Sequence, residues 1–240
     1  MSPLSPRANA GASAGANGRA NDAGGAARVR VIACGMIARE AAAILAQPPL
    51  AHVELTCLPA RWHFEPHRIA QGVREAVKSA RAEGVADVLV GYADCGTGGA
   101  LDRACEELGV ERLPGPHCFA FYQGVGRADA LAEHDMTSFF VTDFLARQPD
   151  AFLWRPLGLD RHPELMETYF GHYERVVYLA QTDDGALAAS ARAIAARLGL
   201  PLEHRRTGYG DLAPALEALA RGGSHDGSRD GRRDGNRDGA

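Results

Sequence analysis

The sequence predicts an α/β fold, namely one domain with a mostly parallel, doubly wound sheet of Rossmann or flavodoxin type. Two observations support this prediction. Short β-branched apolar runs alternate with segments of helical spacing over residues 29–205. Residues 1–27 contain one Leu and no aromatic residue, and residues 222–240 of the 240-residue chain contain no large apolar residue, so neither end can form a core. The middle, residues 28–221, has the size of an ordinary domain with a single core.

The two ends of the chain have a composition typical of unfolded segments. Residues 1–27 are mostly Ala, Gly, Asn, Ser, Pro and Arg, and residues 222–240 repeat Asp-Gly and Arg-Asp. Neither segment buries enough surface to offset the entropy of ordering it. We therefore expect a disordered extension over 1–27, the α/β domain over 28–221 and a disordered tail over 222–240.

In the first half of the domain, apolar β-branched runs predict strands at 29–34, 52–57 and 86–92. A segment of helical spacing follows each run. Pro48 ends the first of these helices, and Gly84 has the position of a glycine that closes a helix. A weaker strand is expected near Arg112 or just before His117.

The second half continues the alternation. An aromatic-rich helix is predicted over 137–148 with Thr137 as its cap, and another helix is predicted to start near Asp160. A strand at 175–180, a helix at 184–198 and a strand at 202–205 follow. Strands that alternate with helices in this way indicate a mostly parallel sheet covered on both faces.

Composition excludes several classes of function. The formal net charge is −4 and the calculated pI is about 6.1, with no basic stripe interleaved with aromatic residues, so nucleic acid is not an expected partner. No apolar run approaches the roughly 20 residues of a membrane span, and no apolar secretory segment begins the chain. We expect a cytoplasmic protein whose five cysteines stay reduced or bind metal.

Four residues are predicted to meet at one edge of the sheet. Ligands of an open parallel sheet bind beyond the carboxyl ends of its strands, where the strand order reverses. Cys34 ends the first strand and Cys95 follows the third, so a flavodoxin-like order, 2-1-3-4-5, places them across one crevice. His117 and Cys118 follow the expected fourth strand and reach the same rim. Thiolate and imidazole are zinc ligands, so Cys34, Cys95 and either His117 or Cys118 predict a zinc site with three protein ligands and an open position.

The other cysteines are expected to be structural, because a free cysteine often behaves as a small buried hydrophobe. Cys105 lies on the apolar face of a predicted helix. Cys57 ends a strand farther from the crevice and is expected in the core. The same structural interpretation remains open for each cysteine of the predicted zinc site.

A glycine-rich turn adjoins the predicted site. Its residues Gly96, Thr97, Gly98 and Gly99 precede a helix, so their amides are expected to bind an anionic group of a cofactor or substrate. Asp94 and Cys95, at the start of this turn, are candidate catalytic residues. His63, in the loop after the second strand, is a third candidate, although a lone loop histidine is often simply solvated.

Together these motifs resemble a protein family known as domain of unknown function 1638, over residues 31–212. The motifs that carry the resemblance are Ala33-Cys-Gly35, Leu58-Pro59 with His63, Gly91-Tyr-Ala-Asp-Cys-Gly-Thr-Gly-Gly99, Leu113-Pro-Gly-Pro-His-Cys118, Thr142-Asp-Phe-Leu145, Gly158-Leu-Asp-Arg-His-Pro-Glu-Leu165, Tyr178-Leu-Ala-Gln-Thr-Asp183 and Thr207-Gly-Tyr-Gly-Asp211. The family often has Gly where this chain has Ala93, a departure that leaves Cys95 in place. The resemblance implies an association with corrinoid-dependent methyl transfer.

Four hypotheses of function follow. The first is a zinc-thiolate protein of one-carbon, corrinoid-linked methyl metabolism, in which the metal activates a thiol or water of a small-molecule substrate. The second uses the same cysteines to bind an iron–sulfur cluster. The third needs no metal and uses two facing thiols as an acid/base pair, as in the aspartate/glutamate racemase superfamily. The fourth is a non-catalytic accessory protein that binds a corrinoid protein or its cofactor.

Overall fold

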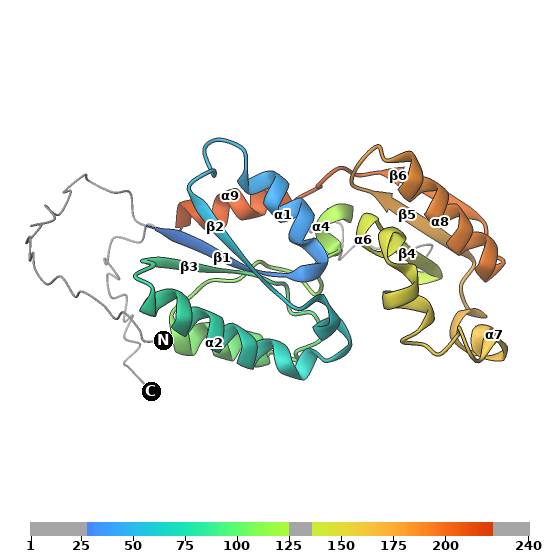
Figure 1. Ribbon diagram of the computed structural model, residues 1–240, viewed down its shortest axis with the longest axis horizontal. Coiled ribbons are helices and arrows are strands. Elements are labelled where there is room, and N and C mark those ends of the chain that lie inside the picture. The colour runs from blue at the N-terminus through green and yellow to red at the C-terminus, as the bar shows by residue number, and fades with distance from the viewer. Residues whose placement is uncertain (1–27, 125–135, 223–240) are drawn as a thin grey trace, which may run out of the picture.

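The computed structural model describes residues 28–124 and 136–222 (Figure 1). Its described strands form two separate sheets of three parallel strands each, with helices packed on them. The predicted α/β class with parallel strands is therefore confirmed, whereas a single doubly wound sheet is not. The tails predicted at 1–27 and 222–240 lie outside the described residues, apart from Gly222. We call the parts built on the two sheets the N-terminal lobe and the C-terminal lobe.

The sheet of the N-terminal lobe has the order β2-β1-β3, with β1 at Val29–Cys34, β2 at Val53–Leu58 and β3 at Asp87–Gly91. β1 is central and almost wholly buried, which explains its unbroken apolar run. Its last residues pair with the last residues of both neighbours, since Cys34 lies opposite Leu58 and Ala33 lies opposite Gly91. The strands therefore end together at one edge.

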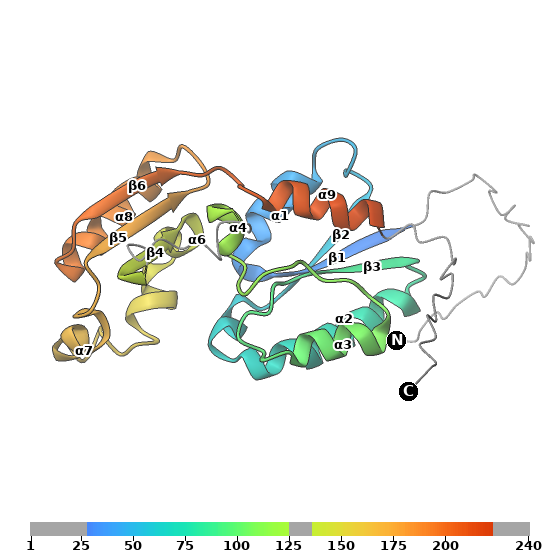
Figure 2. The same cartoon turned by 180° about the vertical axis from the view of Figure 1, so that it is seen from behind.

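Helices cover both faces of this sheet (Figures 1 and 2). α1 (Ala38–Leu45) and α9 (Leu212–Gly222) lie on one face, and α2 (Ile69–Ala82) and α3 (Ala100–Leu108) lie on the other. The sequence interpretation did not include α9. The chain reaches α9 from the C-terminal lobe, so the two lobes are linked by more than one crossing of the backbone.

The sheet of the C-terminal lobe has the order β4-β5-β6, with β4 at Ser138–Thr142, β5 at Arg175–Ala180 and β6 at Leu202–Arg206. α6 (Asp143–Arg147) and α8 (Gly185–Leu198) pack on it. Alternate residues of β5 belong to different cores. Val176, Tyr178 and Ala180 lie in the core of the C-terminal lobe, and Val177 and Leu179 lie in that of the N-terminal lobe.

The helix predicted over 137–148 is wrong in its first half. Residues 138–142 form β4, and the helix begins only at Asp143, with the Thr142 hydroxyl accepting from the Leu145 amide at 3.5 Å. The run Phe139-Phe140-Val141 suits a strand because aromatic and β-branched side chains pack well on a pleated surface. Its side chains alternate between the two cores, with Phe140 against one and Val141 in the other.

Short elements complete the described chain. They are η1 (Gly35–Ile37), η2 (Ala60–Phe64), η3 (Pro66–Arg68), α4 (Ala120–Gln123), η5 (Asp150–Trp154), η6 (Pro163–Leu165) and α7 (Met166–Phe170). The weak strand expected near Arg112 is a single parallel bridge to Val90. None of the helices in the described ranges is long and apolar enough to cross a membrane.

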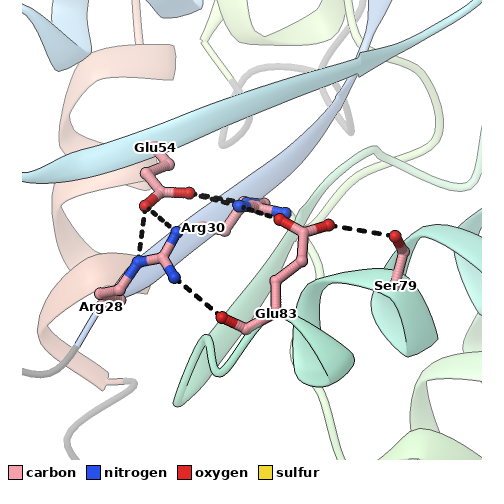
Figure 3. Close-up of polar contacts among 5 residues, drawn as sticks. All are labelled: Arg28, Arg30, Glu54, Ser79 and Glu83. Carbon is pink, nitrogen blue, oxygen red and sulfur yellow. Dashed lines mark hydrogen bonds and ion pairs between the residues drawn. The ribbon is translucent and has the colours of Figure 1, made fainter. Parts of the chain in front are cut away.

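An ion-pair network ties the amino-terminal end of β1 to its neighbours (Figure 3). The Glu54 carboxylate on β2 accepts from Arg28 at 2.7 Å and from Arg30 Nε at 2.9 Å. Arg30 also donates to Glu83 at 2.9 Å, and Ser79 donates to the other Glu83 oxygen at 3.1 Å. These groups lie at the end of the sheet opposite to Cys34, so the network stabilises the lobe without touching the predicted site.

Candidate functional site

Three of the residues predicted to form the metal site are neighbours in the structure. The Sγ atoms of Cys95 and Cys118 are 3.1 Å apart, and the Cys118 thiol also interacts with that of Cys34. We call Cys34, Cys95 and Cys118 the thiol cluster. It lies at the carboxyl ends of β1 and β3, where the flavodoxin-like order predicted it.

Cys34 is positioned by the tight passage from β1 into α1. Its side chain accepts from the Met36 amide at 3.5 Å. The next residue, Gly35, lets the chain pass close to β2, since an added Cβ would lie 2.7 Å from the Leu58 carbonyl oxygen. A larger residue at Gly35 would therefore push the end of β1 away from β2.

Cys95 is held by backbone pairing of two loops. The amides of Asp94 and Cys95 donate to the carbonyls of Gly115 and Pro116, at 3.0 and 2.8 Å. This pairing brings the loop after β3 against the segment that leads to Cys118. Cys95 has a φ of 50°, the only positive φ of a non-glycine residue in the described ranges. Such backbone strain tends to persist at sites where a side chain must have a particular orientation.

Interactions within the thiol cluster shift the pKa values of two thiols in opposite directions. The interaction with the Cys118 thiol lowers the pKa of Cys34 against the opposing effect of burial, and the Met36 amide adds to the lowering. The pKa of Cys118 is raised by sharing hydrogen bonds with Cys34 and Cys95 and by burial. Of these two thiols, Cys34 therefore loses its proton more readily than Cys118.

Tyr92 adds a buried hydroxyl to this environment. Its side chain is fully buried, and its Oη has no oxygen or nitrogen partner among the described residues, its interaction being with the Cys34 thiol. Burial raises the pKa of Tyr92, and the nearby charges of Cys34, Cys118 and Cys95 raise it further. A buried hydroxyl without an oxygen or nitrogen partner is uncommon in a folded protein and indicates an unmet demand for a polar group beside the three thiols.

The glycine-rich turn uses its own carboxylate. Asp94 accepts from the Thr97 hydroxyl at 2.6 Å and from the Gly99 amide at 3.1 Å. Burial alone would raise the pKa of Asp94, but these bonds and the Gly98 amide outweigh it and lower the pKa. Asp94 thus already supplies an anion to this turn. The expected anion binding by Gly96, Thr97, Gly98 and Gly99 remains a prediction.

The two candidate histidines each pack against an aromatic ring. The His117 ring packs on Phe119, with ring centroids 3.8 Å apart. His63, in η2, has an exposed side chain that packs edge-on against Phe64. Partial desolvation lowers the pKa of both histidines, and His63 lowers that of His117 further. Of the pair His117-Cys118, the structure therefore places Cys118 in contact with the other thiols.

The two remaining cysteines, Cys57 and Cys105, differ in their exposure to solvent. Cys105 is buried on α3, as predicted, and burial raises its pKa to about 11. The expectation that Cys57 lies in the core is wrong, because its side chain is exposed. β2 is an edge strand, and its carboxyl end is less covered than that of the central strand.

Sequence reasoning missed one buried acid near the thiol cluster. Glu40, on α1, is 4% exposed and forms no ion pair within the described ranges. Desolvation raises the pKa of Glu40, and Arg147 lowers it only in part. The pKa of Tyr122 is raised by burial and then by the nearby charges of Glu40 and Cys118, so both the acid and the cluster affect this hydroxyl. The signal was present, because Glu40 falls on the apolar face of its helix with Ile37 and Ile44.

The second sheet has a polar group at its corresponding edge. The Asp143 carboxylate is fully buried and accepts from the Tyr178 hydroxyl at 2.6 Å, the Gln181 amide at 3.1 Å and the Thr182 amide at 2.9 Å. The Thr182 hydroxyl also donates to it. This network joins two of the sequence motifs that carry the family resemblance, at 142–145 and 178–183.

Neither a ready-made metal site nor a deep pocket marks the thiol cluster. Within residues 28–124 and 136–222, no group of three or more His, Cys, Asp and Glu side chains is arranged to hold a metal ion. A surface hollow of about 310 Å³ lies elsewhere, at the amino-terminal ends of β5 and β6, and is lined by Glu174, Arg175, Pro201, Leu202 and Glu203. The chemistry of the thiols, rather than a preformed cavity, therefore identifies the site.

Comparison with known proteins agrees with the resemblance found in the sequence. The chain belongs to the family described as "Protein of unknown function (DUF1638)", whose model matches residues 57–216. The matched segment includes Cys95 and Cys118 and begins after Cys34. A search of curated proteins and a search of solved structures each found no significant match.

Proposed function

We propose that this member of the family is a zinc-thiolate protein that binds the metal through Cys34, Cys95 and Cys118. The observation that carries the proposal is the 3.1 Å contact between the sulfurs of Cys95 and Cys118, with Cys34 adjoining the same thiol. Thiolates are soft ligands that zinc prefers, and three protein ligands leave a position open for a substrate.

Two of the three proposed donors lie close to the spacing that such an ion requires. Zinc–sulfur bonds of about 2.3 Å in tetrahedral geometry hold two sulfurs roughly 3.8 Å apart. Cys95 and Cys118 would therefore separate by about 0.7 Å from the measured contact, which a modest side-chain rotation achieves. The Tyr92 hydroxyl, which has no oxygen or nitrogen partner among the described residues, supports the proposal, because it would face a polar group bound at the cluster.

The chemistry follows from the groups around the cluster. A bound zinc would lower the pKa of a substrate thiol or water. Tyr92 would orient what binds there by hydrogen bonding, and the side chains around the cluster would exclude water. The order β2-β1-β3 is that of the first strands of a flavodoxin-like sheet, so we place the site at the switch point of such a fold. The family resemblance suggests corrinoid-linked methyl metabolism as the context, with a corrinoid protein as a partner.

A second candidate function uses the thiols without metal. The opposite pKa shifts of Cys34 and Cys118 support an acid/base pair in which Cys34 accepts a proton and Cys118 donates one. This hypothesis predicts that alkylation of Cys34 abolishes the acid/base activity of protein that contains no metal.

Metal content tests the proposal. Full-length protein purified without air and without a histidine tag should contain about one zinc per chain by elemental analysis. The Cys95→Ser variant should lose this zinc while its circular dichroism spectrum is unchanged. Cys105→Ser is the matched control, since it should keep the zinc and lose about 1–3 kcal/mol of stability because a hydroxyl is buried without a partner. Zinc retained in Cys95→Ser but lost in Cys105→Ser would refute the site.

A further inference from the structure

We propose that Cys95 and Cys118 are a redox-active pair. They form an intramolecular disulfide with each other when a small-molecule disulfide oxidises them. Their sulfurs are 3.1 Å apart, against a disulfide bond of about 2.05 Å. All five cysteines are free thiols in the structure. The pair therefore needs a further approach of about 1 Å to form the bond.

The backbone holds this pair together independently of any ligand. The amides of Asp94 and Cys95 are bonded to the carbonyls of Gly115 and Pro116. The two loops are thus joined within a few residues of both cysteines. Because the loops are already in register, rotation of the two side chains suffices and no element of the fold has to move.

Exposure decides which thiol reacts first. Cys95 is half-buried, whereas Cys34 and Cys118 are only 6% and 7% exposed. A small disulfide from solvent therefore meets Cys95 before the other two. Cys57 is more exposed than Cys95, but no other cysteine is recorded in contact with its sulfur within the described ranges. Cys57 should stop at a mixed disulfide, and the pair should go on to an internal one.

The reaction balances as two thiol–disulfide exchanges. The Cys95 thiolate attacks one sulfur of the small disulfide, forms a mixed disulfide and releases one small thiolate. The Cys118 sulfur then attacks the Cys95 sulfur and releases the second small thiolate. The protein loses two protons and two electrons in total, and the small disulfide is reduced to two thiols.

This chemistry is distinct from the proposed zinc binding and competes with it. The disulfide uses two of the three proposed ligands, so an oxidised chain cannot hold the metal at the thiol cluster. The pair would make the site responsive to the thiol–disulfide balance of its surroundings. The inference stands on the geometry of the thiols alone, whether or not zinc binds.

Peptide mapping tests the inference directly. The full chain, reduced and treated with a chelator, is incubated with 2-hydroxyethyl disulfide, quenched with N-ethylmaleimide and digested with trypsin. Cleavage after Arg81, Arg103, Arg112 and Arg127 places Cys95, Cys105 and Cys118 on three separate peptides. We expect peptide 82–103 linked to peptide 113–127, with Cys105 alkylated by maleimide.

Matched variants separate the steps. Cys118→Ser should stop at the mixed disulfide on Cys95, whereas Cys57→Ser should form the internal disulfide at the wild-type rate. If Cys118→Ser does not fold, the peptide map of Cys57→Ser alone still shows whether Cys95 and Cys118 form the internal disulfide. Failure to link 82–103 to 113–127, with both cysteines alkylated, would overturn the inference.

Repeating the reaction with saturating zinc distinguishes the two proposals. Zinc that slows the linkage at least tenfold supports both. Linkage at the same rate with and without zinc keeps the redox pair and argues against the zinc site.

Discussion

Both sheets have three parallel strands, but the buried polar groups at their carboxyl edges differ in whether they have oxygen or nitrogen partners. In the C-terminal lobe, the buried Asp143 carboxylate is saturated by donors from Tyr178, Gln181 and Thr182. In the N-terminal lobe, three thiols adjoin a Tyr92 hydroxyl that interacts with the Cys34 thiol and has no oxygen or nitrogen partner among the described residues. Both edges lie where ligands of parallel sheets bind, yet of these two buried groups only the hydroxyl is left without such a partner.

This difference separates a structural polar group from a functional one. A buried network in which every group has a partner rigidifies the fold, and removing one member is costly. A buried group that lacks a partner costs stability and is kept where it has another role. We therefore expect the edge of the C-terminal lobe to contribute stability, and the edge of the N-terminal lobe is where our proposal places the chemistry.

The largest expected effect tests the structural side of this comparison. Asp143→Asn removes the charge and replaces one acceptor oxygen by a donor, so two of the four donors lose their acceptor. We expect a loss of about 3 kcal/mol or more in the free energy of unfolding. Chemical denaturation followed by circular dichroism measures it.

The control is Asp184→Asn in the same lobe. The Asp184 side chain caps α8 by accepting from the Ala186 amide at 2.8 Å, and asparagine caps a helix equally well. This variant should unfold with nearly the wild-type free energy. An Asp143→Asn variant as stable as Asp184→Asn would remove the basis of the comparison.

Local patterns were enough to predict part of this arrangement. The buried run of β1 and the turn after β3 placed Cys34 and Cys95 at one edge, because parallel strands that are neighbours end together. The exposure of Cys57 was missed although the predicted order already put its strand at the edge, because residue alternation does not show how well the end of an edge strand is covered.

The division into two sheets could not be predicted, because alternating strands and helices do not specify how many sheets they form. The strand at 138–142 was misread because its phenylalanines also fit a helical period together with Phe144. The partners of Asp143 are 35–39 residues away in sequence, and only the folded chain shows that they meet. Glu40 was detectable from its spacing on the apolar face of α1.

A smaller effect is expected at Glu40, on the functional side of the comparison. Its folded pKa is raised above its unfolded value, so the folded state retains the proton more strongly. Stability from this group is therefore lost as the pH rises from the usual value of about 4.3 through the folded pKa. The charged groups that affect it are Arg147, Asp143 and Arg39.

Glu40→Gln cannot ionise, so we expect it to melt at a higher temperature than the wild type at pH 8. Each kcal/mol gained corresponds to about 2–4 °C for a chain of this size. The advantage should shrink as the pH falls through the raised folded pKa of Glu40 and should be absent below about 4.3. Glu106→Gln, at an exposed position of α3, should show no such gain. A lower melting temperature for Glu40→Gln at pH 8 would place Glu40 with Asp143 as a structural acid.

The smallest effect is expected at the opposite end of the N-terminal sheet, where the network of Arg28, Arg30, Glu54, Glu83 and Ser79 is exposed to solvent (Figure 3). Hydrogen bonds from Arg30 and Arg28 lower the pKa of Glu54. The stability that Glu54 contributes is therefore present above its unfolded pKa of about 4.3 and is lost as the pH falls through the lower folded value. Exposed pairs contribute little and are screened by salt.

Glu54→Gln should lower the melting temperature slightly at pH 7 in low salt, and the difference from wild type should shrink at pH 3 or in 1 M NaCl. Glu65→Gln, which removes the single exposed pair with Arg68, should have no measurable effect. A loss at Glu54 as large as that of Asp143→Asn would mean that the fold depends on this network as much as on the buried carboxylate of the other lobe.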